Sequence, residues 1–155
     1  MYVNVIAVGE KLPSWVNIAI DDYAKRIRGM FNIRITEIPV EKRCKTKSLE
    51  QVINAEGDRI LQLIQPNTFV AALEVKGKPY TSETFAVEMQ HLIGSGQDLA
   101  FIIGGPDGLS DACLKRANSH WSLSSFTLPH ALARVVIVEQ IYRAQTIITG
   151  HPYHK

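Results

Sequence analysis

Two segments near the C-terminal end contain residue types suited to a small-molecule site. Residues 104–108 are Gly-Gly-Pro-Asp-Gly and follow an apolar run, and residues 124–130 are Ser-Ser-Phe-Thr-Leu-Pro-His. Glycine lets a ligand approach the main chain, and hydroxyl groups can hydrogen-bond an adenine edge or a ribose. Because ligands of open α/β sheets bind at the carboxyl ends of strands, the two segments together predict a nucleotide-like site. The structural alternative is a tight turn, followed by hydroxyls that cap the next helix.

The segment after these turns combines a long apolar run with charged residues at helical spacing. Val135–Val138 is apolar, which predicts a helix buried on more than one side, by the core and by a second copy of the chain. The alternative is the central core helix of a monomer. Glu139 and Arg143 are four residues apart, and a helical ion pair alone would account for both.

The C-terminal residues 150–155 contain two histidines and a tyrosine. His151 and His154 could bind a metal, but no Cys or carboxylate stands close by to complete a zinc site, so we expect no metal. Tyr153 can stack on a base, and His154 can accept a proton near neutral pH. The alternative is an ordinary frayed end.

Basic residues gather in two clusters. Lys42, Arg43, Lys45 and Lys47 follow the second predicted strand, and a second cluster lies within residues 25–28. Solvated faces are the ordinary explanation for short charge runs. The first cluster also has a position from which it could contact a phosphate backbone, which predicts RNA binding there.

Composition places the chain among ordinary globular domains. It has 155 residues, 46% hydrophobic and 21% charged, and a net charge of +2 that permits an acidic partner without requiring one. No stretch approaches the roughly 20 apolar residues of a membrane span, and no secretory signal pattern is present, so we expect a cytoplasmic protein. The two cysteines lack C-x-x-C spacing. P-loop, G-x-G-x-x-G and G-x-S-x-G motifs are absent, which excludes the site classes that depend on them.

Apolar runs alternate with amphipathic segments along the chain. Ser14 is the expected N-cap of the first helix, and Ser48–Gln51 has a capping-box pattern. The alternation predicts an α/β fold with a mostly parallel sheet of five to six strands and helices on both faces, in a single domain over residues 1–155. The expected strands are 2–8, 33–40, 68–75, 99–103 and 121–128, and the expected helices are about 15–27, 49–65, 82–93, 110–118 and 130–148.

The motifs taken together resemble one known family. The chain is similar to the RlmH family of SPOUT-class ribosomal RNA methyltransferases, which methylate a pseudouridine of large-subunit ribosomal RNA. The similarity runs essentially end to end. It is carried by VIAVG at 5–9, PVEKR at 39–43, GKP at 77–79, IGGPDG at 103–108, WSLS at 121–124, TLPH at 127–130, the R-V-x-x-x-E-Q-x-Y-R-A pattern at 134–144 and HPYHK at 151–155.

This resemblance implies a fold, a cofactor and a set of site residues. It implies a C-terminal trefoil knot, a homodimer, a knot- and dimer-forming part at about 99–155, and S-adenosylmethionine as methyl donor. Arg143, Tyr153 and His154 are the implied catalytic residues, and Arg134 would lie near the carboxylate of the donor. The implied donor contacts are Leu73, Gly105, Ser124, Ser125, Phe126, Thr127, Leu128 and Pro129.

The expected reaction is methylation of the ring imide nitrogen of a pseudouridine in large-subunit ribosomal RNA. The modest net charge and the lack of an added RNA-binding domain predict that the substrate is an assembled ribosome rather than free RNA. Two alternatives stay open at this point. The same scaffold could methylate transfer RNA, or the chain could be a non-catalytic ribosome-binding factor.

Overall fold

Strands and helices alternate along the whole chain. The computed structural model describes residues 1–154, and of His154 it describes the backbone only. The elements are β1 (Tyr2–Val8), α1 (Ser14–Arg26), β2 (Asn32–Ile38), α2 (Leu49–Gln62), β3 (Phe69–Pro79), α3 (Ser82–Ser95), β4 (Leu99–Ile103), α4 (Asp111–Arg116), β5 (Ser119–Ser122), α5 (His130–Ile148) and the 3-10 turn η1 (Pro152–His154).

The strands form one parallel sheet. Their order is β2-β1-β4-β3-β5, and every neighbouring pair runs in the same direction. All five residues of the central strand β4 are buried, as expected for a strand covered on both faces. In a parallel sheet the carboxyl ends of the strands share one edge, so the segments that follow β3, β4 and β5 lie near one another. The predicted parallel sheet is confirmed, with five strands.

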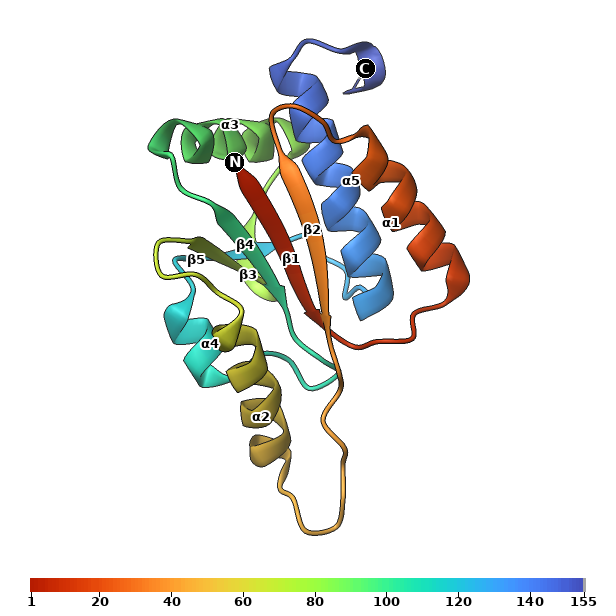
Figure 1. Cartoon of the computed structure of the whole chain (residues 1–155), viewed down its shortest axis with the longest axis vertical. Helices are drawn as coiled ribbons and strands as arrows, with labels where there is room; N and C mark the ends of the chain where they lie inside the picture. Colours follow the sequence, from red (N-terminus) through yellow and green to blue (C-terminus); the bar gives the residue numbers. More distant parts are fainter. Residues whose placement is uncertain (155) are drawn as a thin grey trace.

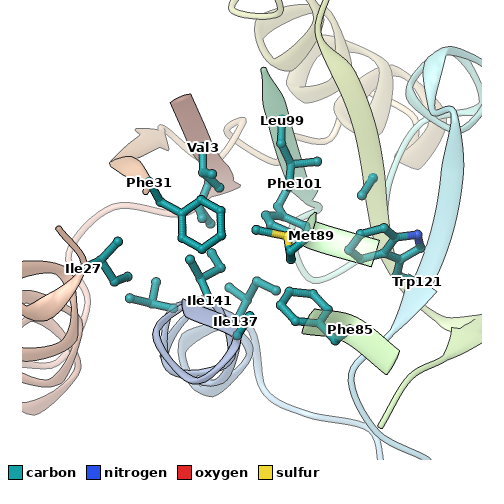
Figure 2. Close-up of a cluster of buried hydrophobic side chains, with 14 of the residues drawn as sticks. Val3, Ile27, Phe31, Phe85, Met89, Leu99, Phe101, Trp121, Ile137 and Ile141 are labelled. Carbon is teal, nitrogen blue, oxygen red and sulfur yellow. The ribbon is translucent and has the colours of Figure 1, made fainter. Parts of the chain in front are cut away.

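Helices cover both faces of this sheet (Figure 1). Val3 and Val5 of β1 pack in a cluster with α1, α3 and α5, while Ile6 and Val8 pack on the opposite side with α2 and α4. This division follows from the alternation of side chains along a strand. Figure 2 shows the larger cluster, in which side chains of α3 and α5 meet those of the sheet.

The larger cluster contains an aromatic group that holds the edge strand β5 in place. Trp121 is 1% exposed, and its ring lies 5.6 Å from Phe85, 5.4 Å from Phe101 and 4.9 Å from Tyr80. Such contacts stabilise by about 0.5–1.5 kcal/mol per pair beyond the burial of area. This packing fixes the place where the chain leaves the sheet for the segment 123–129.

Several predicted boundaries differ from the structure. Ser14 is the first residue of α1, and its N-cap is Pro13, which offers no side-chain hydrogen bond. The capping box at Ser48 is present as expected. The strand predicted at 121–128 is wrong beyond Ser122, because β5 pairs only with β3 and residues 123–129 form no strand pairing. The third strand instead continues to Pro79.

The strand order is compatible with the fold that the resemblance implies. Strand order does not describe whether the C-terminal segment passes through a loop, so the trefoil knot stays a prediction. None of the helices within residues 1–154 has the length and apolar character needed to cross a membrane.

Candidate functional site

A cavity of about 510 Å³ lies at the carboxyl edge of the sheet. Its size falls within the range of about 300–1,000 Å³ that small-molecule sites occupy. Its walls come from residues 73–76 of β3, the turn after β4, Leu114 of α4, the segment after β5 and the first turn of α5. Two of them are the Gly-rich and Ser-rich segments for which the sequence predicted a ligand. The structure brings those two segments together around one hollow.

The turn after β4 is closed by contacts between its own glycines. The Gly108 N–H donates to the Gly105 carbonyl at 3.0 Å, and Gly108 has a φ of 88°. A Cβ atom at Gly104 would lie 2.4 Å from the carbonyl of Gly108. A Cβ at Gly105 would meet the Glu56 carboxylate at 2.9 Å. A side chain at position 105 would thus crowd the end of the Glu56 side chain, which could shift, so packing alone restricts Gly105 less than Gly104.

The hydroxyl-rich segment after β5 lies along the cavity. Ser124, Phe126, Thr127 and Leu128 line it, whereas Ser125 and Pro129 are outside the lining set. The Ser124 hydroxyl accepts a hydrogen bond from the Phe126 N–H at 2.9 Å, which makes a local turn.

These hydroxyls do not cap α5. The N-cap of α5 is Pro129, which makes no side-chain capping bond, so the structural alternative for this segment is wrong. The uncapped first turn of α5 borders the cavity through His130 and Ala133. Free N–H groups at a helix N-terminus favour a negatively charged group such as a carboxylate. Burial, followed by the charge of Arg134, lowers the pKa of His130, which keeps its imidazole neutral at neutral pH.

Arg134 lies outside the cavity lining. It is 1% exposed, and its guanidinium donates to the carbonyls of Val8 and Gly9 at 2.7 and 2.8 Å and to Glu37 at 3.1 Å. Arg134 therefore does not line the cavity, and a position near the carboxylate of a donor bound beside His130 stays a prediction. Its bonds fasten the start of α5 to the ends of β1 and β2, and so they position His130 beside the cavity.

Leu73 also borders the cavity, at the point where β3 becomes irregular. Leu73 and Lys78 both lie opposite Trp121 of β5, which marks a bulge between them. Glu74 and Lys76 fall within this bulge and line the cavity. Sequence reasoning missed both residues. The one available signal was Gly77, a glycine inside a strand pattern, which indicates a bulge or a close backbone approach.

Arg143 and Tyr153 form a separate cluster near the C-terminal end of α5. Arg143 donates to Glu139 at 2.6 and 3.0 Å, and the Tyr153 hydroxyl donates to the same carboxylate at 3.1 Å. The guanidinium of Arg143 lies 4.9 Å from the centre of the Tyr153 ring. The helical ion pair is thus present. Its carboxylate also accepts a hydrogen bond from Tyr153 and so holds the C-terminal segment 150–153, the tail, against α5. The side chain of His154, the third predicted catalytic residue, lies outside the described part of the chain.

This cluster and the cavity lie at opposite ends of α5. Arg143 follows His130 by thirteen residues in one α-helix, which corresponds to about 20 Å along the helix axis. Figure 1 shows the C-terminal turn at the far end of α5 from the carboxyl edge of the sheet. A single chain therefore does not bring Arg143 and Tyr153 to the cavity.

The basic loop between β2 and α2 is tied to the glycine turn. Arg43 forms an ion pair with Asp107 of that turn, and Lys47 pairs with Glu41. Lys42 and Lys45 are exposed and form no ion pair within the described residues. The four predicted RNA-binding residues thus divide into two that organise the loop and two that face solvent.

The comparisons with known proteins agree over the full length. A family model described as "Predicted SPOUT methyltransferase" matches residues 1–154. A protein of Hahella chejuensis named "Ribosomal RNA large subunit methyltransferase H" is 46% identical over 155 residues, covering all of this chain and 99% of that protein. A protein of the same name from Thioalkalivibrio sulfidiphilus is 43% identical with the same coverage. The solved structure of a probable methyltransferase from Bordetella pertussis has a TM-score of 0.57 at 18% identity, covering 92% of this chain and 95% of that one, and supports the fold alone.

Proposed function

Because the chain belongs to the SPOUT methyltransferase family, we propose that it transfers a methyl group from S-adenosylmethionine to large-subunit ribosomal RNA. The acceptor in this proposal is the ring imide nitrogen of a pseudouridine. The resemblance that the motifs indicated is confirmed by the family match, and full-length relatives carry a ribosomal RNA methyltransferase name. The observation that carries the proposal is the cavity built from the glycine turn and the hydroxyl-rich segment.

The cavity has the chemistry that the donor requires. Leu73 and Ile103 supply apolar wall for an adenine, and the main chain of residues 104–108 and 122–124 offers polar groups to its edge and to the ribose. The uncapped start of α5 suits the carboxylate of the amino-acid part. When bound, S-adenosylmethionine supplies an electrophilic methyl group on a sulfonium. The chain's residues then have to fix donor and acceptor in line.

The acceptor nitrogen must also lose its proton. If its pKa lies two to three units above neutrality, forming the anion costs roughly 3–4 kcal/mol. In this proposal Arg143 offsets part of that cost with its positive charge, and His154 accepts the proton. Burial, followed by hydrogen bonding to Tyr23 and the Glu139 charge, raises the pKa of Tyr153. Tyr153 therefore stays protonated and acts as a donor and a stacking surface rather than as the base.

We propose further that two copies of the chain complete each site. The cavity and the Arg143 cluster lie about 20 Å apart along α5 of one chain, so a tail from a second copy has to reach the cavity. Phe126 lines the cavity yet is 81% exposed, as a contact surface for a partner would be. The homodimer would form through residues of about 99–155, which would also contain the knot, within a single domain of residues 1–155.

The assembled ribosome is the proposed substrate, which would place the protein in the cytoplasm. Lys42 and Lys45 form no ion pair with any described residue and present two cations per chain, and a dimer doubles that number. Two cations per chain are few for binding free RNA, because each phosphate contact adds only a small, salt-dependent increment to the affinity. Two other functions compete with this proposal: methylation of transfer RNA on the same scaffold, and a non-catalytic ribosome-binding role.

Labelled methyl transfer separates the three functions. Ribosomes, free large-subunit RNA and transfer RNA, all from cells lacking the protein, are incubated with the protein and donor labelled in the methyl group. We expect incorporation into ribosomes, little into free RNA and none with Arg143→Ala. Incorporation into transfer RNA alone would support the second function. Absence of donor binding by calorimetry, with no incorporation anywhere, would support the third.

A further inference from the structure

The third strand departs from regular pairing where it reaches the cavity. Leu73 and Lys78 of β3 both lie opposite Trp121 of β5, so the residues between them have no partner in β5. A bulge of this kind redirects side chains and is frequent beside active sites. Glu74, Val75 and Lys76, all within the bulge, line the cavity.

A close backbone contact fixes where the bulge ends. A Cβ atom at Gly77 would lie 2.5 Å from the carbonyl carbon of Trp121 and 2.6 Å from its nitrogen. Only glycine lets β3 return to the edge strand at this distance. The bulge therefore has a defined length, and Glu74 has a defined place at the cavity wall.

Glu74 is the one carboxylate among the described residues that line the cavity. The other ionisable lining groups are Lys76 and His130, and the imidazole of His130 is held neutral by burial and by Arg134. Asp107 belongs to the glycine turn, but its carboxylate pairs with Arg43 of the basic loop. Lys76 also lines the cavity but is exposed, so Glu74 is the described lining group whose negative charge can act as the counter-charge of a positively charged ligand.

The Glu74 carboxylate is also oriented. Its Oε1 lies 2.6 Å from Nδ1 of His120 on the neighbouring strand β5, and its side chain is 31% exposed. A carboxylate held by a hydrogen bond and partly shielded from water keeps more of its electrostatic effect than one free in solvent.

From this geometry we propose that Glu74 is a specificity-determining residue, held in place by His120, that recognises the positive charge of the methyl donor. The inference rests on the proposed function, because it assumes that this cavity holds S-adenosylmethionine. In the reaction the sulfur–methyl bond breaks and its electron pair stays on sulfur. A nitrogen–methyl bond forms, and the imide proton passes to its acceptor.

The ligand left in the cavity is S-adenosylhomocysteine, whose sulfur is neutral. The charge of the bound molecule thus falls by one, and the attraction to Glu74 falls with it. Glu74 therefore favours entry of the donor and departure of the product.

Calorimetry with the two ligands tests the proposal. Affinities for S-adenosylmethionine and S-adenosylhomocysteine are measured for the full chain, for Glu74→Gln, for the charge-retaining Glu74→Asp and for Glu88→Gln, which removes a carboxylate from α3 outside the cavity lining. We expect the full chain to prefer the donor about three- to tenfold, as one partly screened charge pair allows. Glu74→Gln should abolish the preference, and Glu74→Asp and Glu88→Gln should keep it.

Salt provides a second measurement that needs no variant. Because screening shortens the reach of charges, the preference of the unsubstituted chain should shrink as ionic strength rises from about 0.05 to 1 M. An unchanged preference in Glu74→Gln, or equal affinities in the unsubstituted chain at low salt, would overturn the role of Glu74 and leave the proposed function standing. If the chain bound neither ligand, both proposals would fail.

Discussion

Gly104 and Gly77 mark the places where main chain approaches main chain around the cavity. A Cβ at either position would lie about 2.4–2.5 Å from backbone atoms of Gly108 or Trp121, and backbone cannot move aside as a flexible side chain can. Both glycines are therefore required by packing. Gly105 differs, since its closest neighbour is the end of the Glu56 side chain.

Substituting Gly104 should damage the cavity more than the fold. We expect Gly104→Ala to displace the 104–108 turn and to weaken donor binding by at least about tenfold, or roughly 1.4 kcal/mol, in calorimetry. Gly94→Ala in α3 is the matched control, because no atom lies within 4 Å of the added Cβ. That control should bind donor normally. Its free energy of unfolding should be the same or higher by up to about 1 kcal/mol, which would be seen as an equal or slightly higher melting temperature. Normal donor affinity in Gly104→Ala would contradict the role given to the turn.

Tyr153 fastens the tail through a hydroxyl that stays protonated. Because its pKa in the folded chain is raised above the unfolded value of about 10, the stabilisation is complete below pH 10 and is lost as pH rises through the folded value. Hydrogen exchange of the His151 and Tyr153 amides should therefore be slow and steady up to about pH 10, after correction for intrinsic rates. Tyr153→Phe should speed that exchange at about pH 8, by an amount that reflects a lost bond of about 0.5–1.5 kcal/mol. Equal exchange in both proteins would show that the hydroxyl does not hold the tail.

At the scale of elements, the sequence predicted the regular strands and helices and missed the irregular segments between them. The strands β1 and β4 and the helix α5 have the boundaries that hydrophobic periodicity indicated, because each packs a regular apolar face. The segment 123–129 contains Phe126 and Thr127, which suit a strand, yet no neighbouring strand pairs with it. Pairing depends on what lies beside a segment in space, and periodicity does not contain that information.

The candidate site divides in the same way. The residue types at Gly105 and Ser124–Leu128 were enough to indicate the cavity, because glycines and hydroxyls at strand ends suit a ligand wherever the chain brings them together. Glu74 was missed because its place depends on the bulge between β3 and β5, a tertiary feature. The bonds of Arg134 to Val8 and Gly9 were missed because they join residues more than a hundred positions apart.

Substitutions in the basic loop should have separate effects on RNA binding and on the structure of the cavity. Lys42 and Lys45 form no ion pair within the described chain, so Lys42→Ala with Lys45→Ala should weaken ribosome binding and lower the salt slope, with donor affinity unchanged. Arg43 is bonded to Asp107 of the glycine turn, so Arg43→Ala should weaken donor binding as well. Filter binding at several salt concentrations and calorimetry measure the two effects. If the double variant lost donor affinity, the division of the loop into two kinds of residue would be wrong.

At the scale of the whole molecule, one chain separates the two parts that the proposed reaction needs. The proposed donor cavity borders the start of α5, and Arg143 and Tyr153 lie near its other end. Helix α5 is a rigid spacer of about 20 Å between them, which no side-chain rearrangement can close. In a two-fold symmetric dimer with antiparallel α5 helices, the Arg143 and Tyr153 cluster of each copy would lie at the cavity of the other copy.

Mixing two inactive variants tests this arrangement most directly. Gly104→Ala has a damaged cavity and an intact tail, and Arg143→Ala has an intact cavity and a damaged tail. If sites are shared between copies, unfolding and refolding an equal mixture should restore about a quarter of the methyl transfer to ribosomes, because half of the dimers are mixed and each mixed dimer has one intact site. At a donor concentration well below the Kd of Gly104→Ala, each variant alone should stay far below this level after the same treatment. A mixture as inactive as its components, with mixed dimers shown to be present by mass spectrometry, would contradict the account.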